Sequence, residues 1–306
     1  MSAGTHRQVT RPSVKLPRGS TDCHVHLFDG QRFPFAAKRA YTPGTALLGD
    51  LLAFEDQLGI ERVVLVQPSV YGTDNAAMLD GLQRLGPEKA RGVAVIDLEQ
   101  AQEKEISELH AHGVRSIRLN LAVNGERDHS AAIAQLQRAA EVVGHAGWSV
   151  QIYADVDVIA AMSDAISSLK VRVVLDHFAG VKASRKADQA AAFATVIELL
   201  KGGNVYTKLS APYRASRNAP DYEDVRDFAI ALIEAGPDRV IWASDWPHTG
   251  SASSRTGGLD VIEPFRDVDA GHALNQILKW AGNEDMQRRI LVDNPARLYD
   301  FGPLPA

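Results

Sequence analysis

The chain has 306 residues, 45% of them hydrophobic and 23% charged, which suits one large α/β barrel or two ordinary domains. Its formal net charge of −5 argues against a nucleic-acid surface, and no apolar run is long enough to cross a membrane. The single cysteine, Cys23, excludes an internal disulfide and fits a reducing compartment, so we expect a cytoplasmic protein.

Short β-branched segments alternate with longer amphipathic ones along the whole chain. The segments predicted as strands are residues 21–28, 60–69, 91–97, 114–121, 147–154, 171–180, 203–211 and 239–248. Helical patterns lie between them, and most of these end at a glycine. Strands that alternate with helices pair in parallel, and eight of them favour a closed (β/α)8 TIM barrel. We expect an N-terminal arm over residues 1–19 and one barrel domain over residues 20–306.

The first predicted strand, "TDCHVHLF", carries an H-x-H pair. Side chains alternate between the two faces of a strand, so Asp22, His24 and His26 should share one face. Cys23 should share the opposite, helix-facing side, which argues against a nucleophilic role for it. The two histidines are then expected to point into the barrel near its mouth.

Polar residues also stand at the ends of later strands. They are Ser69, Arg118, Asn120, Tyr153, His177, Ser210, Tyr213, Arg214, Asp245 and His248. Catalytic groups of such barrels lie at the carboxyl ends of the strands, so these side chains should converge. Each has an ordinary alternative: Asp245 could cap the following segment, and the stem of Arg118 could cover apolar surface. Together with H-x-H they predict an active site.

Several motifs resemble the amidohydrolase superfamily (amidohydrolase-related), in the branch of the pyrone-dicarboxylate lactonases and related sugar-lactone hydrolases. The motifs are the H-x-H pair, "YTP" (41–43), "LVQPS" (65–69), "IRLN" (117–120), "LDHFAG" (175–180), "KLSAPYR" (208–214), "SDWPH" (244–248) and "NPARLY" (294–299). The resemblance runs from about residue 20 to the end. It implies an amidohydrolase-like barrel that opens a lactone, an ester within a ring.

Many members of that superfamily hold divalent metals on H-x-H, further histidines and an aspartate after the eighth strand. Here the fourth and fifth strands offer Arg118 and Tyr153 where metal ligands commonly stand, and a dication beside Arg118 would be repelled. We therefore expect no required cofactor. The alternative is one zinc ion on His24, His26, His177 and Asp245.

The resemblance implies a mechanism with Asp245 as general base. His24, His26 and His177 would donate hydrogen bonds to the carbonyl oxygen as it gains charge. The expected substrate-binding residues are Arg118, Arg214, Tyr41, Ser69, Tyr153, Asn120 and His248. A further family arginine after the fourth strand aligns with Asn124, and Arg127 follows three residues later. Whether Arg127 replaces that carboxylate clamp decides between a pyrone dicarboxylate and a muconolactone-like, sulfonated or sugar-acid lactone.

Other readings of the same residues stay open. A zinc-dependent hydrolase or decarboxylase would use the metal to activate water or substrate. A lactone isomerase would use the same base and oxyanion site without water, and an inactive barrel would only bind a small acid. For all active forms we expect a small acidic lactone as the partner, no nucleic acid, no membrane, and a monomer or small homo-oligomer.

Overall fold

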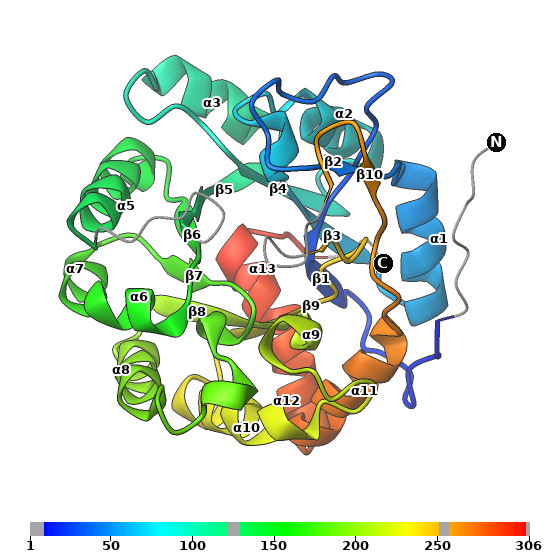
Figure 1. Ribbon diagram of the computed structural model, residues 1–306, viewed down its shortest axis with the longest axis vertical. Coiled ribbons are helices and arrows are strands. Elements are labelled where there is room, and N and C mark those ends of the chain that lie inside the picture. The colour runs from blue at the N-terminus through cyan, green and yellow to red at the C-terminus, as the bar shows by residue number, and fades with distance from the viewer. Residues whose placement is uncertain (1–8, 122–128, 251–256, 304–306) are drawn as a thin grey trace.

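The computed structural model describes residues 9–121, 129–250 and 257–303. Its centre is an eight-stranded parallel sheet with the order β1-β3-β4-β5-β6-β7-β8-β9. The strands are β1 (Thr21–Val25), β3 (Arg62–Val66), β4 (Ala90–Ala94), β5 (Val114–Asn120), β6 (Ser149–Tyr153), β7 (Val173–Leu175), β8 (Val205–Ser210) and β9 (Val240–Ala243). The sheet curls into a nearly closed barrel ringed by helices (Figure 1). This confirms the predicted fold.

Most helices follow the strands around the outside of the barrel, while α13 lies across its middle in the view of Figure 1. They are α1 (Leu48–Leu58), α2 (Ala76–Leu85), α3 (Glu103–Ala111), α5 (His129–Gly144), α6 (Val156–Ala161), α7 (Ser163–Ser168), α8 (Ala190–Lys201), α9 (Pro212–Ala215), α10 (Arg226–Ala235), α11 (Ala270–Ala281), α12 (Glu284–Arg288) and α13 (Asn294–Tyr299). No helix in these described ranges combines the length and apolarity that a membrane crossing needs.

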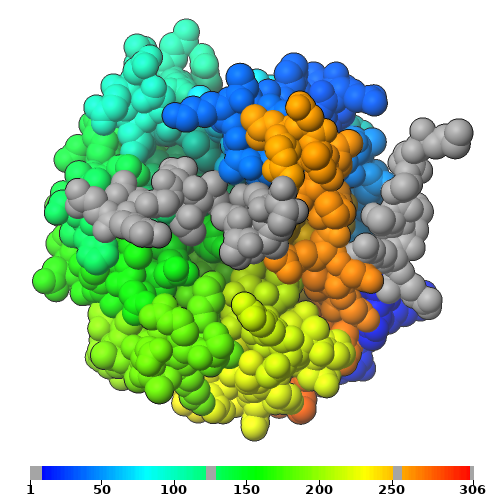
Figure 2. Space-filling view, in the orientation of Figure 1, coloured from blue at the N-terminus to red at the C-terminus, as the bar shows by residue number. Residues whose placement is uncertain are grey.

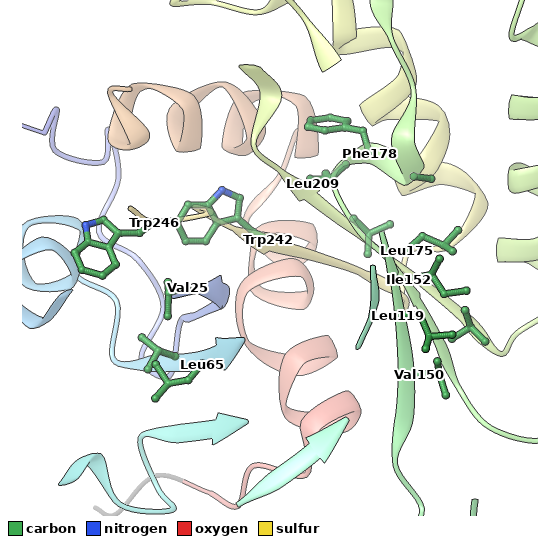
Figure 3. Close-up of a cluster of buried hydrophobic side chains, with 14 of the residues drawn as sticks. Val25, Leu65, Leu119, Val150, Ile152, Leu175, Phe178, Leu209, Trp242 and Trp246 are labelled. Carbon is green, nitrogen blue, oxygen red and sulfur yellow. The ribbon is translucent and has the colours of Figure 1, made fainter. Parts of the chain in front are cut away.

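Two apolar clusters, one on each side of the strands, hold the barrel together. Val63 and Leu65 of β3 belong to the larger cluster shared with the helices, and Val64 and Val66 belong to a smaller one. Figure 3 labels members of the larger cluster: Val25, Leu65, Leu119, Val150, Ile152, Leu175, Phe178, Leu209, Trp242 and Trp246. Fully burying such a side chain contributes about 1.5–3 kcal/mol.

The predicted alternation fails in β1. Asp22 pairs with Val63 and Val25 pairs with Leu65, so β1 has one residue more than β3 over this span. Such a bulge breaks the alternation of side chains. Cys23 therefore lies in the smaller cluster with Val64 and Val66 rather than toward the helices, and the prediction for Cys23 is wrong. The thiol is fully buried, and burial raises its pKa well above the ordinary value.

The amino-terminal end of the barrel is closed by the end of the chain. Leu298 and Tyr299 of α13, together with Phe301, complete the smaller cluster. Arg91 of β4 donates through Nε to the carbonyl oxygen of Tyr299 at 3.1 Å. The polar residues of the predicted site lie at the opposite, carboxyl-terminal end of the strands.

The segments flanking the site differ from the sequence prediction in two ways. Between the first two predicted strands, where a helical pattern was expected, the structure has a short strand, β2 (Thr42–Pro43), before α1 starts at Leu48. β2 pairs with β10 (Ile262–Glu263), far away in the sequence. Figure 2 shows the blue and orange segments side by side on one face. The predicted strands were also too long, because their last residues form the loops that carry the site.

The N-terminal arm packs against α11 from residue 9 onward. Thr10 donates through its backbone N to Asp269 Oδ1 at 3.0 Å, and Ser13 N donates to Asn275 Oδ1 at 2.6 Å.

Candidate active site

Asp245 lies at the centre of the site, two residues after β9. It is 1% exposed and has a left-handed backbone conformation, φ 63°. Tyr213 donates its hydroxyl hydrogen to Asp245 Oδ2 at 2.5 Å, and Arg214 Nε donates to the same oxygen at 2.8 Å. Burial opposes ionisation, but the Arg214 guanidinium outweighs it and holds the Asp245 pKa well below its ordinary value. The group is a carboxylate at working pH.

The other carboxylate oxygen, Asp245 Oδ1, faces three imidazoles. It lies 3.7 Å from His24 Nε2, 3.8 Å from His26 Nε2 and 3.7 Å from His177 Nε2. It accepts no hydrogen bond from the described residues. The structure thus brings together Asp245 and the three predicted histidines. They come from β1 and the segments that follow β1, β7 and β9.

All three imidazoles are neutral near pH 7. Burial is the main cause: it lowers the pKa of His26 to about 4 and that of His177 to about 3, and it lowers that of His24 well below the ordinary value. His177 and the two residues after it have positive φ angles, and this sharp turn follows β7 directly. Ser210 Oγ lies 2.8 Å from His177 Nδ1 and orients that ring.

His26 has a role different from the predicted one. Its Nδ1 lies 2.7 Å from the carbonyl oxygen of Val66, which can only accept a hydrogen bond. Nδ1 therefore carries the hydrogen, and Nε2 of the neutral ring presents a lone pair to the site. His26 can accept from His24 Nε2, 3.2 Å away, but it is not the donor to a carbonyl oxygen that the sequence suggested.

Two arginines border this cluster on either side of Tyr153. The guanidinium carbons of Arg118 and Arg214 lie 5.6 and 5.9 Å from the centre of the Tyr153 ring. Arg118 is 8% exposed, and its Nε makes no hydrogen bond with the described residues. Arg214 is instead engaged by Asp245 and by the oxygens of Thr249 at 3.2 Å. Arg118 is thus better placed than Arg214 for a substrate anion.

The other predicted binding residues lie around the same end of the barrel. Asn120 ends β5 and pairs with Tyr153 in register, while Ser69 opens a 3₁₀ turn after β3. Tyr41 directly precedes β2 and is buried. The His248 ring lies 5.9 Å from that of Tyr213. Substrate-binding roles for these residues stay predictions, and Asn124 and Arg127 lie outside the described residues.

Sequence reasoning missed a buried polar group beneath the histidines. Lys208 Nζ lies 3.1 Å from His24 Nδ1, 3.1 Å from Asp176 Oδ1 and 2.7 Å from Gln151 Oε1. Gln151 and Lys208 are fully buried and Asp176 is 1% exposed. The signal was available: a lysine within an otherwise apolar strand, two residues before Ser210, has to find buried partners.

The spacing of the histidine and aspartate atoms would suit one zinc ion, but the surrounding charge does not. Ligand atoms of a tetrahedral zinc site stand about 3.4 Å apart for bonds of about 2.1 Å. The separations from Asp245 Oδ1 to the three Nε2 atoms and between His24 and His26 are 3.2–3.8 Å, while the atoms of His24, His177 and Asp245 lie within 4.8 Å of one another. However, three cations, Arg118, Lys208 and Arg214, are buried here beside the carboxylates of Asp176 and Asp245, with Asp22 as a third carboxylate above its raised pKa of about 7. A dication would be repelled by those three cations. The expectation that no metal is required therefore stays a prediction.

Comparisons with known proteins agree with this geometry. Residues 21–301 match the family model described as amidohydrolase. The chain is 33% identical to the 4-sulfomuconolactone hydrolase of Hydrogenophaga intermedia (93% of this chain, 89% of that protein). It is 35% identical to the 2-pyrone-4,6-dicarboxylate hydrolase of Comamonas testosteroni (95% and 93%). A solved structure of a putative 2-pyrone-4,6-dicarboxylic acid hydrolase from Pseudomonas putida superposes with a TM-score of 0.78 at 30% identity (94% and 100%). The chain belongs to the amidohydrolase family.

Proposed function

We propose that the protein hydrolyses an acidic lactone, using Asp245 as general base and no metal ion. One observation carries the proposal: Asp245 Oδ2 is held by Tyr213 and Arg214, while Oδ1 faces the imidazoles and has no hydrogen-bond donor among the described residues. A carboxylate held at one oxygen keeps the other in place to take a proton from water. The names of the relatives, both lactone hydrolases, support the reaction class.

In this mechanism, water hydrogen-bonded to Asp245 Oδ1 attacks the ring carbonyl. A bond forms from the water oxygen to the carbonyl carbon, and Asp245 takes the proton. The carbonyl oxygen gains negative charge and is stabilised by hydrogen bonds from Nε2 of His24 and His177, as in an oxyanion hole. The bond to the ring oxygen then breaks, and Asp245 returns its proton to that oxygen. Without substrate, His24 donates its Nε2–H to His26 Nε2; the carbonyl oxygen of the bound lactone takes that hydrogen bond in place of His26.

The positive charge around the site selects an anionic substrate. The Asp245 carboxylate offsets Arg214, but Arg118 stands 3.6 Å from its nearest carboxylate oxygen, Asp176 Oδ2. A carboxylate or sulfonate of the lactone would complete the hydrogen bonding of Arg118, with Tyr153 beside it. The single cysteine and the acidic net charge still favour a cytoplasmic protein that does not bind nucleic acid, and a monomer or small homo-oligomer.

A substrate panel tests this function. Sulfonated muconolactones, pyrone dicarboxylates and sugar-acid lactones would each be assayed beside the neutral methyl ester or desulfonated analogue. We expect kcat/KM at least tenfold higher for one acidic lactone than for its neutral counterpart, because Arg118 pairs only with the charged form. Equal rates for each charged and neutral pair would contradict the assignment.

A further inference from the structure

The buried group beneath the site has a fixed donor and acceptor order. Burial lowers the pKa of Lys208, but the Asp176 carboxylate, 3.1 Å from Nζ, opposes this and favours the ammonium form, which has hydrogens to donate and no lone pair. Gln151 Nε2 donates to Asp176 Oδ2 at 2.9 Å, so its oxygen is the atom turned to Lys208 at 2.7 Å. Lys208 therefore donates to Gln151, and its contact of 3.1 Å with His24 Nδ1 is also a donated hydrogen bond.

From this order we infer that Lys208 is a positioning residue that fixes the tautomer of His24, with the ring hydrogen on Nε2. His24 Nδ1 accepts from Lys208, so the neutral ring must keep its one hydrogen on Nε2. At the other end of the pair, Val66 holds the His26 hydrogen on Nδ1. The 3.2 Å contact between the two Nε2 atoms is then a proper hydrogen bond from His24 to His26.

The opposite arrangement would have His24 Nδ1–H donating to Asp176 Oδ1, 3.3 Å away. The geometry disfavours it, because His24 Nδ1 lies nearer to Lys208 Nζ, at 3.1 Å, than to Asp176 Oδ1, and an ammonium can only donate. It would also leave two facing Nε2 lone pairs, on His24 and His26, at 3.2 Å.

This inference rests on the proposed function in one respect. The Nε2–H of His24 is the donor that the carbonyl oxygen of the lactone needs, so Lys208 would act on the reaction without touching the substrate. The same hydrogen leaves His24 Nε2 without the lone pair that a metal ion requires. By keeping the hydrogen on His24 Nε2, Lys208 thus favours a H-x-H pair that makes hydrogen bonds over one that binds a metal ion.

The test is the imidazole nitrogen spectrum of the full chain labelled with ¹⁵N-histidine, at pH 7.5, with His24 assigned through a His24→Gln variant. We expect a protonated Nε2 and an unprotonated Nδ1. In Lys208→Met the hydrogen should move to Nδ1, which can then donate to Asp176. In Gln151→Met, the matched control, Lys208 still reaches His24 and the tautomer should not change.

Loss of a charge from a buried pair can unfold the chain, so Lys208→Met is paired with Lys208→Met/Asp176→Asn, which removes both charges. The same hydrogen shift is expected there. On a lactone substrate, kcat should fall about 10²–10³-fold while KM changes little, as when one oxyanion donor is lost. A hydrogen on Nδ1 in the wild-type protein, or a tautomer unchanged by removing Lys208, would overturn the inference. The spectrum needs no substrate, so this result is independent of whether the lactone assignment holds.

Discussion

In the proposed mechanism, single residues at the mouth of the barrel act as base, hydrogen-bond donors and substrate-binding group. Asp245 was predicted from its position after the eighth strand, and its pairing with Tyr213 and Arg214 could not be. That pairing depends on the turn after β8, where Ala211 has a left-handed φ of 48° and redirects the chain. Of the two arginines predicted to bind substrate, Arg214 pairs with Asp245, while Arg118 Nε has no hydrogen-bond partner among the described residues.

Arg118→Met should raise KM for the acidic lactone roughly ten- to a hundredfold, because a charge-assisted hydrogen bond contributes about 1.5–3 kcal/mol. Steady-state kinetics measure this, and kcat should change less. Arg115→Met is the matched control: Arg115 lies on the same strand, but its Nη1 donates to the carbonyl oxygen of His110 at 2.9 Å, toward the start of the strand. Equal effects of the two substitutions would remove Arg118 from the substrate site.

The pH profile reports the buried imidazoles. The pKa of His26 is lowered to about 4 and that of His177 to about 3, so both rings stay neutral as the pH falls through 6.5. Asp245 is ionised over the same range because its pKa is lowered too. We expect kcat/KM, measured from pH 4.5 to 8, to show no acid limb near 6.5. Asp22, whose pKa is raised to about 7, also titrates in this range, so the profile is measured for Asp22→Asn as well. A limb near 6.5 in both proteins would mean that a histidine is solvated in the working enzyme.

At the scale of elements, hydrogen bonds between the segments of β1 and β9 close the barrel next to the candidate active site. Asp245 N donates to the carbonyl oxygen of His24 at 3.1 Å, and His26 N donates to that of Trp246 at 2.9 Å. Asp22 Oδ1 ties the two segments together by accepting from His24 N and Ser244 N at 3.1 and 3.0 Å. The seam between β1 and β9 therefore positions the base and the H-x-H pair relative to each other.

Sequence periodicity located every strand of this barrel but not the seam. Alternation assumes a regular strand, and the extra residue in β1 turns Cys23 inward and leaves Asp22 beside Glu55 of α1. Such a bulge has no signature in the sequence. The partners of Lys208 were equally hidden, because Gln151 and Asp176 follow from the order of strands in space and not from spacing along the chain.

The ionisation of Asp22, which joins the β1 and β9 segments, should make the free energy of unfolding depend on pH. Burial raises its pKa from 3.8 to about 7, so the folded protein binds a proton at Asp22 that the unfolded chain has released between these values. The stability contributed by that proton is complete below pH 3.8 and is lost as the pH rises toward 7. Asp22→Asn mimics the protonated group. The free energy of unfolding of Asp22→Asn minus that of the wild type should therefore increase between pH 4 and pH 8, by up to about 4 kcal/mol.

Denaturant titration at several pH values measures this difference. Asp56→Asn, at an exposed carboxylate on α1, is the control and should show a difference that stays constant. A constant difference for Asp22→Asn as well would mean that Asp22 is ionised in the folded protein.

At the scale of the whole molecule, the amino-terminal end of the barrel is closed and apolar, and its carboxyl-terminal end carries the polar residues of the site. The smaller apolar cluster and α13 seal the bottom of the barrel, and β2 and β10 border the mouth. Three buried cations, Arg118, Lys208 and Arg214, stand near three buried carboxylates, Asp22, Asp176 and Asp245, in a chain of net charge −5. The barrel and its family could be predicted from strand count and motifs, while the charge balance that favours an anionic substrate required the structure.

The central claim, a metal-free hydrolysis in which Asp245 activates water, is tested most directly by oxygen labelling. Protein stripped with a chelator and verified metal-free by elemental analysis would turn over the best acidic lactone in ¹⁸O-water, beside Asp245→Asn. The account predicts full activity without metal, one ¹⁸O atom in each opened ring, and a rate about 10²–10⁴-fold lower for Asp245→Asn. An unlabelled product would show isomerisation, and activity lost to the chelator and restored by zinc would show metal catalysis; either would contradict it.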